Sequence, residues 1–166
     1  PHKSMADVIA FHKANPNKFT LASSGNGSSD HLTAELFWQQ TGTTGIHVPY
    51  KGGGPVMTDL LGAQVNGSFM NINTGLNNIK AGKLRGLVMT GPQRSNFAPE
   101  YPTVIESGYA GYELDVWFGM VGSARLPQSV QQRLNAELNR VLQQPDLRDK
   151  LLSQQYEPVG GTAERF

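Results

Sequence analysis

Short apolar segments, glycine-containing loops and helix-forming segments alternate along the first part of the chain, and this alternation constrains the fold more than any other feature. Apolar segments at 19–24, 45–50 and 65–72 are each followed by a loop and then by a stretch with a helical spacing of apolar residues. Another apolar segment covers 84–90. Because strands that alternate with helices at this spacing form βαβ units, the sequence predicts an α/β fold with a mostly parallel sheet flanked by helices.

Local signals mark the ends of several expected helices. Ser4 begins a capping-box pattern, so a helix is expected to start directly after it. A second helix over 30–40 is expected to place Leu32 on its apolar face and to end at Gly42. A third helix is expected to begin at Pro55, because proline suits the first helical position.

The pattern changes after Gly91. Residues 92–112 are rich in proline and glycine, and alternation of apolar and polar residues predicts one strand over 113–121. Two further helices are expected to begin at Pro127 and Pro145. One strand and two helices are too little for an independent fold, so this tail is expected to pack on something else.

Composition excludes several classes of protein. Fourteen basic and 13 acidic residues leave a net charge of +1, which argues against a nucleic-acid binder that relies on a basic surface. The chain has no cysteine, so disulfides, thiolate zinc sites and cysteine nucleophiles are excluded. Its four histidines form no metal-binding pair four residues apart, and no metal site or cofactor is predicted. No apolar run is long enough to span a membrane, and no signal peptide opens the chain, which is expected to be a mature or trimmed piece.

Three loops follow the predicted strands, at 24–29, 50–54 and 72–75. In an open parallel sheet ligands bind beyond the carboxyl ends of the strands, and the start of a helix offers unpaired N–H groups and a partial positive charge. We therefore expect a small anionic ligand, held mostly by backbone and hydroxyl donors. The alternative is that the glycines only make the turns and that Ser28 or Ser29 is only a helix cap. The candidate ligand-binding residues are Ser24, Gly25, Asn26, Gly27, Ser28, Ser29, His31, Tyr50, Lys51, Gly52, Asn73 and Thr74.

Nucleotide binding and catalysis fit these loops poorly. Lys51 precedes its glycines, whereas the lysine of a phosphate loop follows them. Ser28, Asp30 and His31 are neighbours in sequence, whereas a catalytic triad converges from separate elements, so no catalytic residue is predicted. For His31, packing or a hydrogen bond to the neighbouring loop is favoured over ligand contact, and for Lys51 a solvated surface position is at least as plausible as ligand contact.

Several segments, in this order and spacing, resemble the substrate-binding receptors of tripartite tricarboxylate transporters, also called the Bug family. The resemblance covers essentially the whole chain. The segments are Ser-Gly-Asn-Gly-Ser-Ser-Asp-His-Leu at 24–32, Ala-Glu-Leu-Phe at 34–37, His-Val-Pro-Tyr-Lys-Gly-Gly at 47–53, Asp-Leu-Leu-Gly at 59–62, Ile-Lys-Ala-Gly-Lys-Leu-Arg at 79–85, Tyr-Pro-Thr-Val-Ile-Glu at 101–106, the stretch 108–119, Pro-Asp-Leu-Arg at 145–148 and Glu-Pro-Val-Gly-Gly at 157–161.

This resemblance implies a periplasmic receptor with two α/β lobes that close like a flytrap on a small carboxylate. The family delivers its ligand to a membrane permease and performs no chemistry. The resemblance implies that residues 1–110 are the second, ligand-binding lobe and that 111–166 are a return segment of the first lobe. The loop at 24–29 then corresponds to the ligand loop of the second lobe. Amides at Asn26, Asn71 and Asn73 suggest a ligand with a polar group beyond its carboxylate.

Two features depart from the family pattern. The Pro-Gly-Gly loop and Asp that begin the first lobe have no counterpart here, and Arg125 lies in a turn that is usually smaller. The apolar residues of the tail would then lack their partner, so the chain is expected to dimerise, to swap segments or to belong to a longer protein. Two other functions stay open, an α/β enzyme that uses the same anion-binding loops and a ligand-sensing module for a signalling partner.

Overall fold

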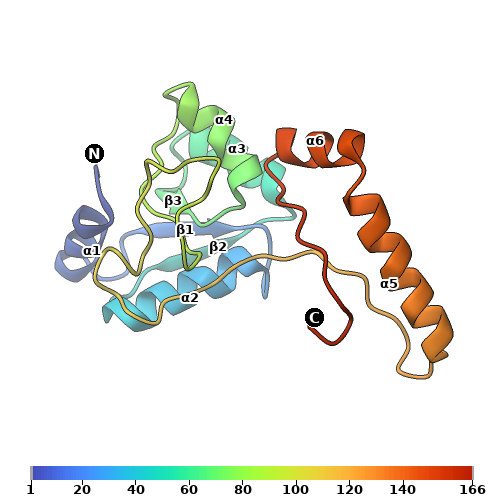
Figure 1. Ribbon diagram of the computed structural model, residues 1–166. Coiled ribbons are helices and arrows are strands. Elements are labelled where there is room, and N and C mark those ends of the chain that lie inside the picture. The colour runs from blue at the N-terminus through green and yellow to red at the C-terminus, as the bar shows by residue number, and fades with distance from the viewer. Residues whose placement is uncertain (1, 166) are drawn as a thin grey trace. The chain divides into compact units, whose positions relative to one another are not determined.

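The computed structural model describes residues 2–165, and the chain divides between Val116 and Trp117 into two compact units, each considered by itself. In unit 1 helices and strands alternate, as the sequence predicts (Figure 1). Its elements are α1 Met5–Ala14, β1 Thr20–Ser23, α2 Ser29–Thr41, β2 Ile46–Pro49, α3 Gly53–Leu61, β3 Gly67–Ser68 and α4 Ile72–Lys80.

The three strands form one parallel sheet in the order β2-β1-β3. Thr20 of β1 pairs with Ile46 of β2, and Leu21 pairs with Gly67 of β3. The α/β class and the parallel sheet are therefore confirmed. In such a sheet the loops after all three strands lie at one edge, which is where a ligand site is expected.

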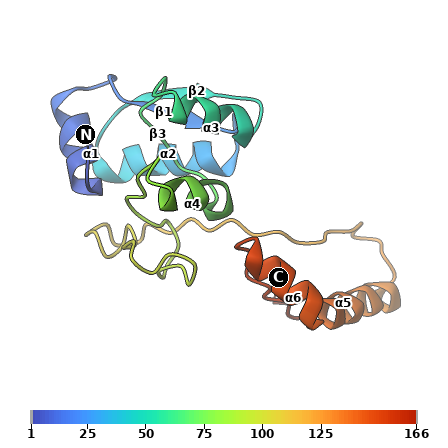
Figure 2. The same ribbon diagram turned by 90° about the horizontal axis from the view of Figure 1, so that it is seen from above.

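Apolar side chains cover both faces of β1, and two separate clusters result. Leu21 packs in a cluster with Phe37 of α2 and with residues of α1, whereas Ala22 packs with Val56 of α3 and with Val65. Successive residues of a strand point to opposite faces, so α2 and α3 cover opposite faces of the sheet. Figure 2 gives a second view of the helices around these strands. The central strand β1 is thus packed on both faces, and the loop at 24–29 follows directly from this well-packed strand.

The expected signals at the helix ends are confirmed. The Ser4 hydroxyl accepts from the Asp7 N–H at 3.2 Å, and the Asp7 carboxylate accepts from the Ser4 N–H at 3.1 Å, which completes the capping box. Gly42 ends α2 in the left-handed conformation, with φ of 61°. Pro145 occupies the first turn of its helix, as expected.

Helix faces and starts differ from the prediction in three places. Leu32 is 53% exposed, because the face of α2 that meets the core carries Ala34, Phe37 and Trp38 instead. Helix α3 begins at Gly53, two residues before Pro55. Helix α4 begins at Ile72, so Asn73 and Thr74 lie in its first turn and not in a loop.

Of the five predicted strands, those over 19–24 and 45–50 correspond to β1 and β2, and the other three are too long or wrong. The segment 65–72 contributes only the two residues of β3. The segment 84–90 makes a single parallel bridge, between Met89 and Thr103. The neighbouring Pro102 offers its carbonyl to the Met89 N–H at 2.8 Å but has no N–H to return, which limits a longer ladder. No strand is assigned over 113–121 within the part of the chain that the structure describes.

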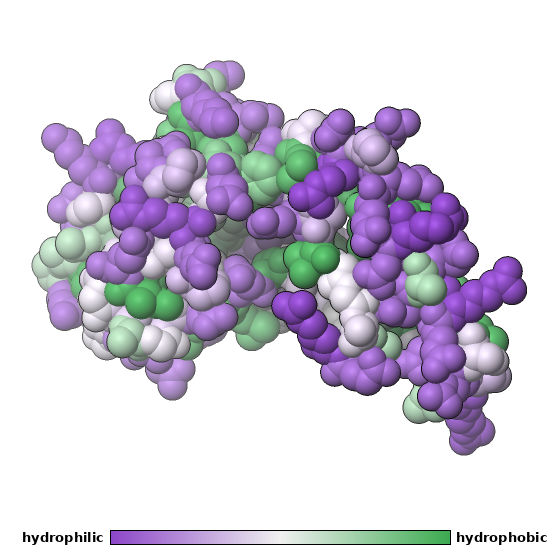
Figure 3. Space-filling model, in the orientation of Figure 1, coloured by the Kyte–Doolittle hydropathy of each residue, from purple (hydrophilic) through white to green (hydrophobic). Residues whose placement is uncertain are grey.

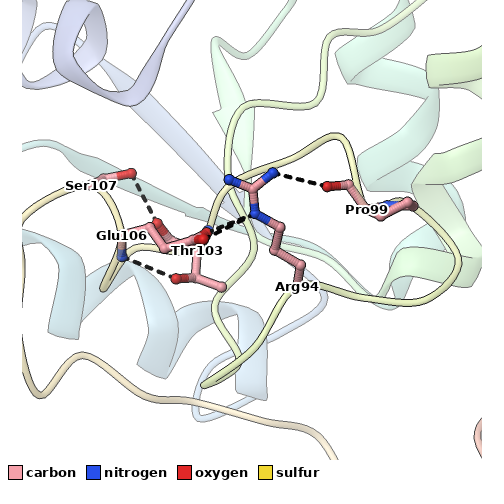
Figure 4. Close-up of polar contacts among 5 residues, drawn as sticks. All are labelled: Arg94, Pro99, Thr103, Glu106 and Ser107. Carbon is pink, nitrogen blue, oxygen red and sulfur yellow. Dashed lines mark hydrogen bonds and ion pairs between the residues drawn. The ribbon is translucent and has the colours of Figure 1, made fainter.

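A polar cluster holds the proline-rich segment of unit 1 (Figure 4). The Glu106 carboxylate accepts from the Thr103 N–H at 2.7 Å, and the Thr103 hydroxyl accepts from the Glu106 N–H at 3.0 Å. Arg94 donates through Nε to both Glu106 oxygens and through a terminal nitrogen to the Pro99 carbonyl. These bonds lower the pKa of Glu106, the Thr103 N–H most of all and Arg94 next. The segment 92–107 is therefore held by side chains where regular secondary structure is sparse.

Unit 2 contains α5 Gln128–Leu142 and α6 Pro145–Ser153. Val130, Leu134 and Leu138 on one side of α5 are exposed. On the face of the molecule shown in Figure 3, hydrophobic residues form separate patches within a mostly hydrophilic surface. Among the described residues, no helix has the length and apolar character needed to cross a membrane.

Candidate ligand-binding loops

The loop after β1 is a tight turn whose own polar groups hold it in shape. The Ser28 N–H donates to the Gly25 carbonyl at 3.2 Å, and Ser28 caps α2 by accepting from the His31 N–H at 3.3 Å. Gly27 lies at φ of 75°, a conformation that other residues adopt only with strain. The N-cap alternative for Ser28 is thus realised, and Ser28 starts the helix while it closes the turn.

Ser23, which is fully buried at the end of β1, connects this loop to β2. Its hydroxyl lies 3.1 Å from the Gly25 carbonyl, 3.3 Å from the Gly25 nitrogen and 2.6 Å from Nε2 of His47. A serine hydroxyl has one hydrogen to donate and two lone pairs. If that hydrogen goes to the Gly25 carbonyl, His47 donates to the hydroxyl through Nε2–H, and every group in the contact is satisfied.

Ser24 already binds a carboxylate within the chain. Its N–H and its hydroxyl both donate to Oδ2 of Asp30, at 3.0 and 2.6 Å. A carboxylate accepts such bonds more strongly than a neutral group does. Both Ser24 donors, which the sequence suggests for a ligand, therefore bind Asp30 in this structure.

His31 lies between the loop and β2. Its Nδ1 accepts from the Gly27 N–H at 3.0 Å, which matches the favoured expectation of a hydrogen bond to the neighbouring loop. Its Nε2 lies 3.4 Å from Oε1 of Glu35, one turn further along α2. Its ring stacks on that of His47 with centroids 3.8 Å apart and an angle of 9° between the planes. Burial lowers the pKa of His47, the neighbouring His31 lowers it further, and Glu35 raises it.

The loop after β2 lies beside the loop after β1. The Tyr50 N–H donates to the Ser23 carbonyl and the Gly52 N–H donates to the Ser24 carbonyl, both at 2.9 Å. The Tyr50 hydroxyl donates to Asp59 at 2.6 Å, and this hydrogen bond raises the pKa of Tyr50. Lys51 is exposed, so the solvated alternative describes it in this structure.

The third group of candidate residues lies next to the second loop. A Cβ on Gly53 would come 3.7 Å from the Thr74 methyl group, so the first turns of α3 and α4 are in contact. Asn73 is half-buried and Thr74 is exposed. The fold therefore brings the candidate residues of all three segments to one edge of the sheet. Their role in ligand binding stays a prediction.

Four residues of this arrangement were not among the sequence candidates, namely Ser23, Asp30, His47 and Asp59. The position of Ser23 and His47 at neighbouring strand ends is a usable signal, because parallel strands place such residues side by side. Asp30 and Asp59 carry no comparable signal, since isolated acidic residues on helices are usually solvated. Within residues 2–165 no three His, Cys, Asp or Glu side chains are grouped so that they could hold a metal ion.

The amino-acid sequence matches a known family over its whole length. The model of the tripartite tricarboxylate transporter family receptor matches residues 1–166. Protein BugT of Bordetella pertussis is 33% identical over 162 residues, which are 98% of this chain and 50% of that protein. The chain thus spans about half the length of the curated relatives it matches.

Solved structures show the same fold. An R. palustris protein solved with adipate has a TM-score of 0.88 at 31% identity, over 99% of this chain and 55% of that one. The periplasmic binding protein BugD has a TM-score of 0.79 at 30% identity, over 93% of this chain and 52% of that one. The chain therefore has part of a periplasmic-binding-protein fold, and it belongs to the receptor family of the tripartite tricarboxylate transporters.

Proposed function

We propose that the protein containing this chain is a periplasmic receptor that captures a small carboxylate and delivers it to the membrane permease of a tripartite tricarboxylate-type transporter. The observation that carries this proposal is the close similarity, over nearly the whole chain, to a protein solved with adipate. The family match and the three adjoining loops at the edge of the parallel sheet agree with it. In this proposal the protein binds its ligand without turnover and is no enzyme.

The loop at 24–29 would contact the ligand's carboxylate, and the other two segments would form the wall around the rest of the ligand. The exposed amide of Asn26 and the half-buried amide of Asn73 would contact a polar group beyond the carboxylate. A ligand favours the closed receptor only by as much as it contacts that state better than the open one. The wall residues, Tyr50, Lys51, Gly52, Asn73 and Thr74, would supply such contacts.

Calorimetric titration of the whole protein tests this function. Adipate, citrate, glutamate and benzoate form a suitable panel, and at least one is expected to bind and to raise the melting temperature without being consumed. Asn26→Ala should weaken binding about 3- to 10-fold, as expected for one lost hydrogen bond. Asn96→Ala is the matched control, because Asn96 is also exposed but lies outside the three segments. Turnover of an ester or phosphate that Ser28→Ala abolishes would favour the enzyme alternative instead.

We also propose that residues 1–110 form the second lobe and that 111–166 are a return segment of the first lobe of the whole protein. The exposure of Val130, Leu134 and Leu138 supports this, because three apolar side chains on one helix face are seldom left in water. The isolated 166-residue chain is then expected to self-associate in light scattering, whereas the whole protein is not. A stable monomer of the isolated chain would contradict the proposal.

A further inference from the structure

The hydrogen bonds around His31 define which of its nitrogens carries a proton. Nδ1 accepts from the Gly27 N–H at 3.0 Å, and a nitrogen that accepts a hydrogen bond has no proton of its own. The neutral ring therefore has its proton on Nε2, which lies 3.4 Å from the Glu35 carboxylate. In this state the Gly27 N–H and Nδ1 of His31 satisfy each other, so neither needs a hydrogen-bond partner from outside the loop.

A second proton on His31 must go to Nδ1, and it changes what the loop offers. Nδ1–H and the Gly27 N–H would then face each other at a distance that suits one donor and one acceptor. Their mutual bond is lost, and both become donors in need of an acceptor. Gly27 is exposed and His31 is half-buried, so an incoming carboxylate can reach both. Two donors and one positive charge match the two oxygens and the negative charge of a carboxylate.

Charged and titratable groups surround the His31 ring. On its own helix, the Glu35 carboxylate lies near Nε2, and the Asp30 carboxylate is held by Ser24. On β2, the His47 ring stacks against it. Burial and the neighbouring His31 lower the pKa of His47, Glu35 raises it, and Nε2 of His47 lies 2.6 Å from the Ser23 hydroxyl. Rings stacked this closely disfavour two positive charges, and His31 is the ring that contacts the loop.

We propose that capture of a carboxylate by the 24–29 loop is coupled to protonation of His31, which then donates to the ligand through Nδ1–H beside the freed Gly27 N–H. This inference rests on the proposed function and assigns His31 a role as a ligand-contacting, titrating residue. The ligand supplies the acceptor that the protonated loop lacks, so binding raises the share of protonated His31.

The test is the pH dependence of adipate binding by the whole protein. Because the proposed complex holds one more proton than the free protein, adipate should bind more tightly at about pH 6 than at about pH 8, by up to about tenfold for each pH unit. Adipate itself stays ionised over this range, because ordinary carboxyl groups titrate near pH 4. Titrations near pH 8 in buffers of different ionisation enthalpy should show an uptake of close to one proton per ligand.

His31→Gln removes the titrating group but keeps an oxygen that can accept from Gly27. We expect its adipate affinity to be nearly constant from pH 6 to pH 8 and its proton uptake to vanish. His2→Gln is the matched control, since His2 lies against Phe11 and Phe19 and outside the three segments, and it should behave like the wild type. Adipate binding that is equally tight at both pH values, or proton uptake that persists in His31→Gln, would overturn the inference and leave the proposed function intact. If adipate, citrate, glutamate and benzoate all fail to bind at either pH, the proposed function itself is wrong.

Discussion

Replacement of Tyr112 by phenylalanine gives a direct measure of how unit 1 is held together. Tyr112 is fully buried in the cluster that includes α1 and α2, and its hydroxyl donates to the Thr33 carbonyl at 3.0 Å. Phenylalanine keeps the buried ring and removes only this hydrogen bond, so the free energy of unfolding should fall by about 1 kcal/mol. Alanine at the same position also leaves a cavity and should lower it by about 3 to 5 kcal/mol.

The pH dependence of this difference provides the sharper test. Burial raises the pKa of Tyr112 in the folded state, whereas in the unfolded chain a tyrosine ionises near pH 10. Above about pH 10 the unfolded state therefore binds fewer protons than the native state, and stability falls with rising pH by up to about 1.4 kcal/mol per pH unit. The advantage of the wild type is complete below that pH. It should vanish between about pH 10.5 and 11, where Tyr112→Phe becomes the more stable protein, since about 1 kcal/mol is then offset.

Urea unfolding followed by circular dichroism at about pH 8 and about pH 11 measures both effects. Other tyrosines and the lysines also titrate in this range, but they do so equally in both proteins, so the difference between wild type and variant isolates Tyr112. A difference that stays the same at the two pH values would refute the argument that the buried hydroxyl keeps its proton in the folded state.

Three further predictions follow from single contacts. Gly45→Ala should destabilise the fold by about 1 to 3 kcal/mol, because its Cβ would lie 2.6 Å from the buried Trp38 ring, whereas Gly54→Ala, which meets no atom within 4 Å, should not; thermal unfolding compares the two. The lowered pKa of Glu106 contributes stability that is present above about pH 4.5 and lost as pH falls through the folded value, so Glu106→Gln should be less stable than wild type at neutral pH and equal to it in acid. Asp30→Asn keeps an acceptor of the same shape but removes a negative charge beside the loop, so adipate should bind a few-fold tighter in low salt, and about 1 M NaCl should abolish the gain.

Sequence reasoning predicted features that depend on chemistry within a few residues. The capping box at Ser4, the glycine that ends α2 at Gly42 and the proline that opens α6 at Pro145 all work through atoms one turn away. The lengths predicted for the later strands were wrong, because strand length depends on pairing with residues that are distant in the sequence. The apolar run 84–90 meets a proline-rich neighbour that pairs at one point only, and Leu32 has the right spacing for the core but lies away from the sheet.

In the candidate site, too, some features were predictable from the sequence and others were not. The place of the three loops was predictable, because the carboxyl ends of parallel strands meet at one edge of the sheet. How their donors are used was not, because the contacts depend on the folded geometry. Ser23 and His47 are 24 residues apart in sequence and 2.6 Å apart in space, and the bonds from Ser24 to Asp30 depend on the turn between them. From the sequence, the loop at 24–29 is expected to offer a series of free donors. In the folded chain most of these donors already have an acceptor.

This internal satisfaction determines how the loop can select a ligand. Because the donors are partnered before a ligand arrives, binding exchanges hydrogen bonds more than it adds them, and each exchange is worth little when the two acceptors are alike. A ligand carboxylate gains little by displacing Asp30 from Ser24, since both acceptors are carboxylates of equal strength. In the proposed mechanism it takes the place of Nδ1 of His31 at the Gly27 N–H once His31 is protonated, because Nδ1 can then no longer accept a hydrogen bond. In that mechanism the preference for an anion over a neutral solute would arise at Gly27 and His31, while the bonds from Ser24 to Asp30 hold the turn in shape.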